Sequence, residues 1–157
     1  MSKFVIPIIV FILAGFFIYR MWNNHKAADV NFAEGQAFLA DNSKHEGVKT
    51  TDSGLQYLIL EDGTGTEHPS ENSRVKVHYE GKLLDGTVFD SSYKRGEPIT
   101  FGLNQVIKGW QEGLQLMVVG QKMRLFVPST LAYGTKGTGP IPPSATLIFD
   151  VELLDIE

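Results

Sequence analysis

The chain has 157 residues, which is enough for one modest domain around one hydrophobic core once a targeting segment is set aside. Its formal net charge is -4 and charged residues make up 20% of it, so it lacks the basic footprint expected of a nucleic-acid-binding protein. Cysteine is absent, which excludes thiol nucleophiles, disulfides and thiolate metal sites.

The first predicted element is an apolar helix at the N-terminus. Every residue from Phe4 to Tyr19 is apolar, small or aromatic, and the run extends through Arg20 to Trp22. At about 1.5 Å per residue, this segment can just cross a bilayer if the Arg20 side chain reaches the interface. We therefore predict a membrane anchor over residues 1–22. A cleaved signal sequence is the alternative, but we find no convincing small-x-small cleavage site after Tyr19.

A linker with one short helix is predicted next, over residues 23–52. Its first part, Asn23 to Val30, is polar, whereas Asn31 to Asn42 has helical spacing. We interpret this helix as a packing or spacer element. A dimerisation surface is the alternative, but one helix of this length offers little area for it. The residues expected to share one face of the helix are Phe32, Ala33, Gln36, Ala37 and Leu39.

From Ser53 onward the pattern changes to β-strands separated by turns rich in glycine and proline. An Asp85-Gly86 turn predicts that one long strand returns as a hairpin. The sheet is therefore expected to be antiparallel. β-Branched and aromatic residues with partial alternation predict strands over Leu55–Glu61, Arg74–Leu83, Gln121–Pro128 and Thr146–Leu154, and the hairpin adds Val88–Asp90.

One segment among the strands has helical spacing instead. Val106, Trp110, Leu114 and Met117 recur at intervals of three or four residues, and Gly120 follows where a C-terminal cap would lie. A single helix against a curved antiparallel sheet predicts an α+β domain over residues 53–157.

The constellations typical of nucleophilic, metal or phosphate chemistry are missing from the sequence. No two histidines lie at a helical ligand spacing and no cysteine completes a zinc set, so we expect neither a metal nor a cofactor. Aromatic residues stand out instead, with one carboxylate among them. Taken singly, each is most simply a core residue. They are Tyr79, Phe89, Asp90, Phe101, Trp110, Tyr133 and Phe149.

Five motifs in order make the domain resemble the FKBP-type peptidyl-prolyl cis-trans isomerases. The resemblance covers roughly Ser53 to Glu157. Upstream, Phe38–Asn42 and Thr51–Tyr57 are similar to the bacterial macrophage-infectivity-potentiator branch of that family. The five motifs are VHYEG (77–81), DGTVFDSS (85–92), QVIKGW (105–110), AYG (132–134) and ATLIFDVEL (145–153).

This resemblance implies a five-stranded antiparallel half-barrel wrapped around one short helix, with a shallow apolar pocket between them. Trp110 would form the floor of the pocket, Asp90 would lie at its rim, and the Tyr133 hydroxyl would point toward the substrate carbonyl. These three are the implied catalytic residues, and the backbone N–H of Ile107 is an implied donor. The implied substrate-binding residues are Tyr79, Phe89, Asp90, Val106, Ile107, Trp110, Tyr133, Ile141 and Phe149.

The implied function is acceleration of rotation about Xaa-Pro bonds during protein folding, the rotamase activity. The implied partners are proline-containing polypeptides and macrolide inhibitors. Together with the anchor, the resemblance predicts a single-pass protein of the bacterial inner membrane whose catalytic domain faces the periplasm.

Two other readings of the same aromatic residues stay open. One is a membrane-tethered, chaperone-like binding module with little turnover, and the other is a purely structural domain in which every aromatic residue is core. The presence of both Asp90 and Tyr133 favours the enzyme, because capture of apolar segments would not require that polar pair.

Overall fold

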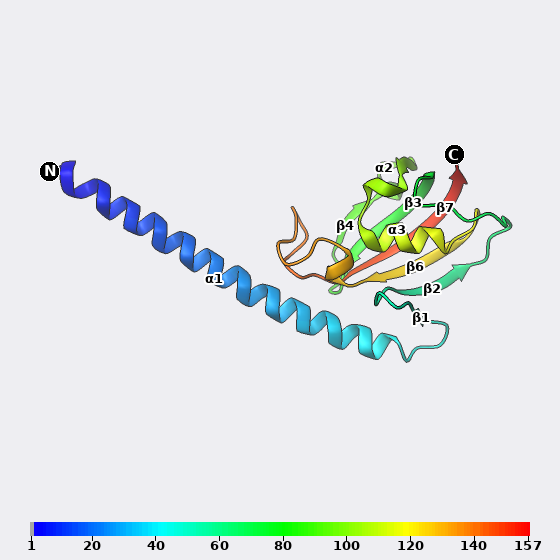
Figure 1. Cartoon of the computed structure of the whole chain (residues 1–157), viewed down its shortest axis with the longest axis horizontal. Coiled ribbons are helices and arrows are strands. Elements are labelled where there is room, and N and C mark those ends of the chain that lie inside the picture. Colours follow the sequence, from blue (N-terminus) through cyan, green and yellow to red (C-terminus); the bar gives the residue numbers. More distant parts are fainter. Residues whose placement is uncertain (1) are drawn as a thin grey trace.

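The computed structural model describes the backbone of residues 2–157 and the side-chain environments from Ile8 onward. A long N-terminal helix, α1 (Ser2–Asn42), leads into an antiparallel sheet that curves around a short helix (Figure 1). The remaining elements are β1 (Lys49–Thr50), β2 (Gln56–Glu61), β3 (Arg74–Leu83), β4 (Val88–Ser91), α2 (Ser92–Arg95), β5 (Ile99–Gly102), η1 (Leu103–Gln105), α3 (Lys108–Gln115), β6 (Lys122–Val127), η2 (Ser129–Leu131) and β7 (Leu147–Ile156).

The predicted α+β class and antiparallel sheet are confirmed, but the predicted number of strands is wrong. The sheet has seven strands in the order β1-β2-β6-β7-β3-β4, with β5 also paired to β3. The five predicted strands correspond to β2, β3, β4, β6 and β7. The two additional strands are short: β1 has two residues and β5 has four, so neither is long enough to show the alternation that marks a half-buried strand.

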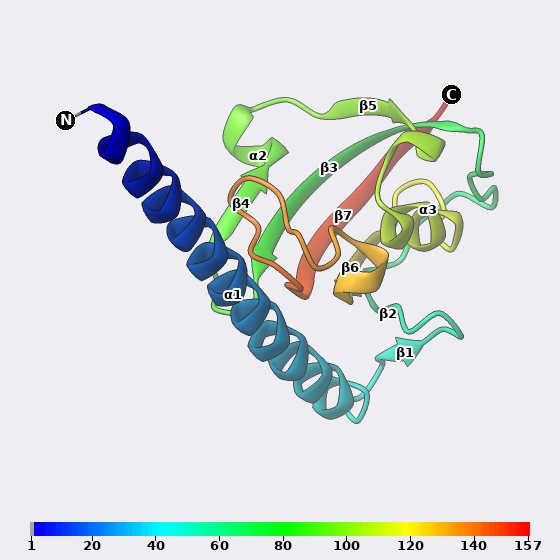
Figure 2. The same ribbon diagram turned by 60° about the vertical axis from the view of Figure 1, so that its left-hand side comes forward.

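The long strands β3 and β7 lie side by side at the centre of the sheet (Figure 2). In β3 the side chains of Val75, Val77 and Tyr79 are buried, and the residues between them are more exposed. This is the period-2 pattern of a strand with one face on the core. The same alternation in β7 buries Phe149 and Val151.

The helix α3 packs directly against β6, and two glycines make the approach possible. A Cβ at Gly109 would lie 2.4 Å from Cγ1 of Val127, and one at Gly113 would lie 2.8 Å from Cδ1 of Leu125. The predicted helix is therefore confirmed. The predicted C-terminal cap is not, because α3 ends at Gln115 and Gly120, with φ 88°, lies in the turn before β6.

The N-terminal region is organised differently from the prediction. A single helix runs through the residues expected to be an anchor, a polar linker and a separate short helix. Its C-terminal part packs on the domain, but Phe32, Ala33, Gln36 and Ala37, predicted to share the packing face with Leu39, are exposed. The residues that α1 buries are Ala28, Gly35, Leu39 and Asn42.

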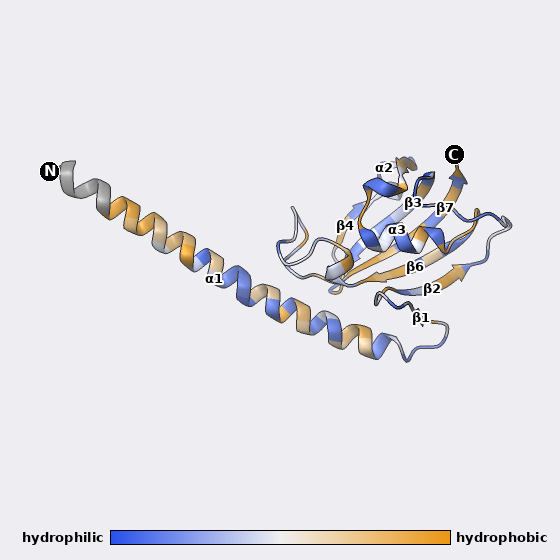
Figure 3. Ribbon diagram, in the orientation of Figure 1, coloured by the Kyte–Doolittle hydropathy of each residue, from blue (hydrophilic) through white to orange (hydrophobic). Residues whose placement is uncertain are grey.

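The predicted transmembrane helix is wrong. In the part of the chain that the structure describes, no helix is both long and apolar enough to cross a membrane. The apolar run is interrupted by Arg20 and ends at Trp22. In the rest of the helix, polar and apolar residues alternate (Figure 3). Positions 4–7 of the predicted anchor lie outside the residues whose side chains are described.

The predicted cellular location fails with the anchor. A single-pass position in the bacterial inner membrane requires a spanning helix, and none is found in the described residues. The predicted periplasmic orientation of the catalytic domain rested on this anchor and on the family resemblance, and it loses the first of these supports.

Candidate active site

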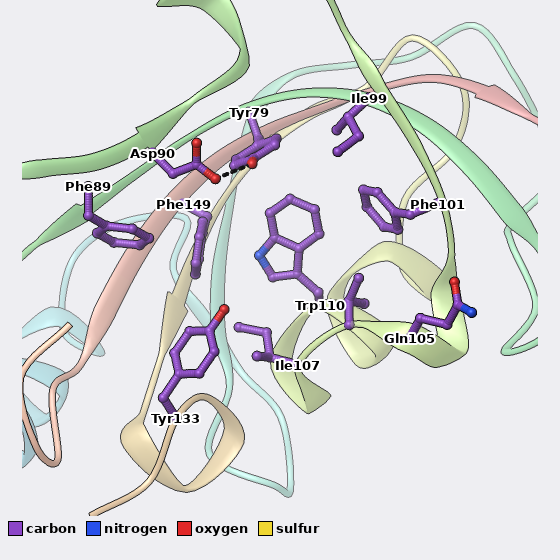
Figure 4. A pocket seen from close by; sticks show the side chains of 11 residues that line it. Tyr79, Phe89, Asp90, Ile99, Phe101, Gln105, Ile107, Trp110, Tyr133 and Phe149 are labelled. Carbon is purple, nitrogen blue, oxygen red and sulfur yellow. Dashed lines mark hydrogen bonds between the residues drawn. The ribbon is translucent and has the colours of Figure 1, made fainter. Parts of the chain in front are cut away.

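An open cavity of about 510 Å³ lies between the sheet, α3 and the loop after η2 (Figure 4). Six separate parts of the chain contribute side chains to it, which is why the cavity depends on the tertiary fold. The lining residues are Tyr79 from β3, Phe89 and Asp90 from β4, Ile99 and Phe101 from β5, Gln105, Val106, Ile107 and Trp110 from η1 through α3, Tyr133 from the loop after η2, and Phe149 from β7.

Most of the predicted substrate-binding residues meet in this cavity. The exception is Ile141, which is 6% exposed and belongs to the hydrophobic core. Three residues line the cavity without having been assigned to it: Ile99, Phe101 and Gln105. Phe101 is one of the aromatic residues singled out in the sequence, and Gln105 begins the QVIKGW motif. The sequence therefore contained evidence that could have assigned both residues to the cavity.

Trp110 forms the floor of the cavity and is held there by aromatic contacts. Its ring centroid lies 5.0 Å from that of Tyr79 and 5.3 Å from that of Phe149, with interplanar angles of 86° and 85°. Such edge-to-face pairs are a favoured arrangement of aromatic rings. The Trp110 side chain is therefore fixed in orientation, with 5% of its surface exposed.

Gly81 on β3 leaves the room that two further aromatic rings need. A Cβ at this position would lie 2.6 Å from Cζ of Phe89 and 2.7 Å from Cε1 of Phe149. These two rings are themselves perpendicular, with centroids 5.6 Å apart. The glycine of the VHYEG motif thus shapes the aromatic wall without being part of its surface.

The rim of the cavity carries a hydrogen-bonded group of three side chains. The Tyr79 hydroxyl donates to Oδ2 of Asp90 (Figure 4), and Nη1 of Arg95 donates to Oδ1 of the same carboxylate. Nη2 of Arg95 also donates to the Tyr79 hydroxyl at 3.2 Å. Arg95 belongs to α2, whose N-terminus is capped by the Ser91 side chain, so a short local helix positions the guanidinium.

These contacts set the protonation states at the rim. Burial raises the pKa of Tyr79, and its hydrogen bond to Asp90 raises it further, so the phenol stays a neutral donor. Burial alone would raise the pKa of Asp90, but the hydrogen bonds from Tyr79 and Arg95 outweigh it and hold this pKa below 3.8. The rim therefore carries a carboxylate at neutral pH.

Several hydrogen-bond donors on residues that line the cavity, the buried Nε1 of Trp110 among them, have no partner within the described residues. The backbone N–H of Ile107 and the Tyr133 hydroxyl have no hydrogen-bond partner there. Tyr133 is 40% exposed and points its hydroxyl into the space above Ile107 (Figure 4). The site thus combines free hydrogen-bond donors with an aromatic floor, an arrangement suited to an extended chain with carbonyl oxygens and an apolar ring.

Comparison with known proteins agrees with this geometry. A family model described as the FKBP-type peptidyl-prolyl cis-trans isomerase matches residues 65–154. A second, described as the domain amino terminal to FKBP-type peptidyl-prolyl isomerase, matches residues 12–59. The second match includes much of the predicted anchor, so this part of α1 belongs to a region that accompanies the isomerase domain in the family.

Individual relatives support the same assignment. The chain is 59% identical over 132 residues to "FKBP-type peptidyl-prolyl cis-trans isomerase FkpA" of Aeromonas hydrophila, covering 84% of this chain and 49% of the relative. It is 48% identical over 134 residues to "Outer membrane protein MIP" of Legionella longbeachae, covering 85% of this chain and 57% of the relative, which confirms the predicted likeness to that branch.

Solved structures show the same fold. The crystal structure of FkpA from Escherichia coli has a TM-score of 0.95 and 41% sequence identity, over 100% of this chain and 73% of that chain. The chain spans about half the length of the curated relatives it matches. On sequence, structure and the cavity together, the chain belongs to the family of FKBP-type peptidyl-prolyl cis-trans isomerases.

Proposed function

We propose that this chain accelerates cis-trans rotation about Xaa-Pro bonds in polypeptides. The observation that carries the proposal is the cavity itself, in which an indole floor and aromatic walls stand beside the free Ile107 N–H and Tyr133 hydroxyl. Family membership supports the reaction class. The proposed catalytic residues are Asp90, Trp110 and Tyr133.

The reaction requires rotation of an amide and no covalent intermediate. Amide resonance sets a barrier of about 18–20 kcal/mol, and resonance is lost in the twisted state. The carbonyl of a twisted amide is less dipolar than that of a planar one. Transfer from water to an apolar cavity therefore costs the twisted amide less than the planar amide, which lowers the barrier to rotation.

Each part of the cavity has a proposed role in this rotation. The proline ring lies on the Trp110 floor, enclosed by Tyr79, Phe89 and Phe149. The Ile107 N–H and the Tyr133 hydroxyl donate to substrate carbonyl oxygens and hold the chain while the bond turns. A rate gain of about a million needs roughly 8 kcal/mol of differential stabilisation, more than a single hydrogen bond supplies, so the apolar surface and the donors must share the task.

The Asp90 carboxylate has an indirect and a direct role in this proposal. It fixes the Tyr79 hydroxyl through a hydrogen bond, which keeps the Tyr79 ring perpendicular to that of Trp110. It also places a negative charge at the rim, where the electrostatic field acts on the amide dipole of the substrate.

A protease-coupled assay with a proline-containing peptide tests the proposed activity. Wild-type protein should accelerate isomerisation, and Tyr133→Phe should lower kcat/KM about tenfold, as expected for the loss of one hydrogen bond. Tyr93→Phe is the matched control, because Tyr93 is also 40% exposed but lies outside the cavity. Peptide binding by a folded wild-type protein without acceleration would reject the enzyme and favour the binding module.

We also propose that macrolide inhibitors bind in the same cavity. Its volume and apolar walls suit a compact ligand with a few carbonyl acceptors. Titration of a macrolide while following Trp110 fluorescence measures this directly, in a Trp22→Phe background that leaves Trp110 as the only indole. A fluorescence signal unchanged at saturating macrolide, together with undiminished peptide turnover, would contradict this proposal.

A further inference from the structure

The C-terminal part of α1 lies against the loop that joins η2 to β7, the loop that also carries Tyr133 (Figure 2). Nδ2 of Asn31 donates to the carbonyl oxygen of Pro143 at 2.8 Å. One turn further along the helix, Gly35 is packed so closely that a Cβ would lie 2.1 Å from Oγ1 of Thr146. Only a glycine allows α1 to approach the end of the loop in this way.

The same helix is fixed at its end by a second set of contacts. Nδ2 of Asn42 donates to Oε1 of Gln56 at 2.9 Å, and Nε2 of Gln56 donates to the Leu39 carbonyl at 2.8 Å. The Phe38 ring lies 6.0 Å from that of Phe126 on β6. Because β2 and β6 hold this end of α1, the helix is a rigid support where it meets the loop.

Hydrogen bonds connect that support to Tyr133 in a few steps. Pro143, which accepts from Asn31, is followed by Ser144, whose N–H donates to the Gly134 carbonyl at 2.9 Å. Gly134 is the residue after Tyr133, and its own N–H donates to the Ser129 carbonyl at 3.0 Å. The two ends of the loop are thereby tied together next to the residue that faces the cavity.

The buried side chain of Ile141 holds the middle of the loop in the core, but few hydrogen bonds fix the rest of it. Between Gly134 and Ser144 the only backbone hydrogen bonds among described residues are the reciprocal pair of Thr138 and Ile141. Ser144 itself has φ 52°, a left-handed conformation that is unfavourable for a residue with a side chain. A loop with few hydrogen bonds and a strained residue keeps one conformation only if its neighbours impose it.

We propose that Asn31 and Gly35 of α1 are positioning residues for the reaction, which hold the η2–β7 loop so that the Tyr133 hydroxyl is set over the cavity. This inference rests on the role proposed above for Tyr133. It makes the C-terminal part of α1 a component of the active site, although none of its residues lines the cavity. Preorganisation of a donor in this way lowers the cost of ordering it during turnover.

The substitution Gly35→Ala tests the contact. The added methyl group must push α1 and Thr146 apart, so kcat/KM for a proline peptide should fall about tenfold, which corresponds to about 1.4 kcal/mol. Amide hydrogen exchange at Gly134 and Ser144 should become faster. The matched control is Gly15→Ala on the same helix, where a Cβ meets nothing within 4 Å, and this variant should keep wild-type values.

A second substitution separates positioning from general damage. Thr146→Ala removes the Oγ1 atom that a Cβ at position 35 would meet and leaves the nearest atom, the Cβ of Thr146, at 3.2 Å. The double variant with Gly35→Ala should therefore regain most of the wild-type kcat/KM and the slow exchange at Ser144. If Gly35 had a structural role alone, the double variant would change the unfolding temperature but would not regain kcat/KM.

Asn31→Leu is a milder variant that stays informative if Gly35→Ala fails to fold. It removes the donor to Pro143 at similar volume, and should lower kcat/KM about threefold and speed exchange at Ser144. Asn23→Leu, at an exposed position of the same helix, is its control. Wild-type turnover and wild-type loop exchange in both Gly35→Ala and Asn31→Leu would overturn the inference. An inactive wild-type protein would instead reject the proposed function, while the exchange measurement would still decide whether α1 orders the loop.

Discussion

Trp110 belongs to the hydrophobic core and to the cavity at once. Its side chain is 5% exposed and packs on Tyr79, Phe101 and Phe149, and its other surface is the cavity floor. Among the described residues its Nε1 is a buried side-chain atom without a hydrogen-bond partner. Such atoms are rare in folded proteins, so the cavity floor carries a buried donor that no other described residue satisfies.

Trp110→Ala should lower the free energy of unfolding by about 3–5 kcal/mol, because it opens a cavity among packed aromatic rings. Urea denaturation followed by circular dichroism measures this. Trp22→Ala is the control, since the Trp22 side chain is 62% exposed, and it should change the free energy by less than about 0.5 kcal/mol. Equal stability of the two variants would contradict the assignment of Trp110 to the core.

The Asp90 carboxylate predicts a particular dependence of stability on pH. Its pKa is lowered in the folded protein, so its ionised form stabilises the fold at pH values above the ordinary 3.8, and this contribution is lost as the pH falls through the lowered pKa. The effect is small, because the side chains of Asp90 and Arg95 are 39% and 45% exposed.

Unfolding temperatures of wild-type and Asp90→Asn proteins should therefore differ by a constant amount well above pH 3.8 and converge as the pH falls below it. Asp62→Asn, at an exposed position away from the cavity, is the control. A difference that grows as the pH falls would show that burial, and not the contacts with Tyr79 and Arg95, controls this carboxylate.

At the scale of elements, the position of the cavity floor depends on how closely α3 approaches β6. The two glycines of α3 face Val127 and Leu125 at distances that leave no space for a Cβ. A helix of eight residues gains little stability by itself, so its place is set by this packing and not by helix propensity.

Gly113→Ala should accordingly destabilise the domain by about 1–3 kcal/mol, the usual cost of inserting a methyl group into a packed contact. This loss opposes the gain of up to about 1 kcal/mol that alanine brings to an unpacked helix. Thermal unfolding compares Gly113→Ala with Gly15→Ala, where alanine brings the same gain in helix stability but its Cβ meets no other atom within 4 Å. An increase in stability for Gly113→Ala would show that α3 can move away from β6 at little cost.

At the scale of the whole molecule, α1 has two parts with different surroundings. Its first described part exposes large apolar side chains such as Phe11, Phe17 and Trp22. This part of the helix extends away from the domain (Figure 1). Its last part, from Ala28 to Asn42, contacts the domain through a buried stripe. The boundary between the arm and the catalytic unit therefore lies inside one continuous helix.

Removal of residues 1–26 should leave the unfolding temperature and kcat/KM unchanged, because the contacts of Asn31, Gly35 and Leu39 remain. Removal of residues 1–42 should cost at least about 2 kcal/mol, the amount that one buried leucine side chain contributes. Differential scanning calorimetry and the peptide assay on both truncated proteins check this. Equal stability of the two would show that the stripe on α1 does not contribute to the domain.

Local patterns in the sequence predicted the fold class, the short helix and the strands β2, β3, β4, β6 and β7, and the resemblance to a known family predicted most of the cavity lining. β3 alternates because one of its faces is buried, and α3 repeats every three or four residues. The lining residues were implied by family motifs, each of which is contiguous in the chain. Each of these signals is contained within about ten residues, so it can be recognised without knowing what the segment contacts.

The tertiary structure alone decided the features that depend on distant partners. Ile141 lies in the core and not in the cavity, β1 and β5 exist only because β2 and β3 offer them hydrogen bonds, and α1 is a single helix that docks on a loop more than a hundred residues away. The apolar run at the N-terminus had the composition of an anchor. Its hydropathy could not predict that the same helix continues to Asn42 and packs on the domain. Burial and strand pairing depend on two surfaces in contact, whereas a local sequence pattern describes only one of those surfaces.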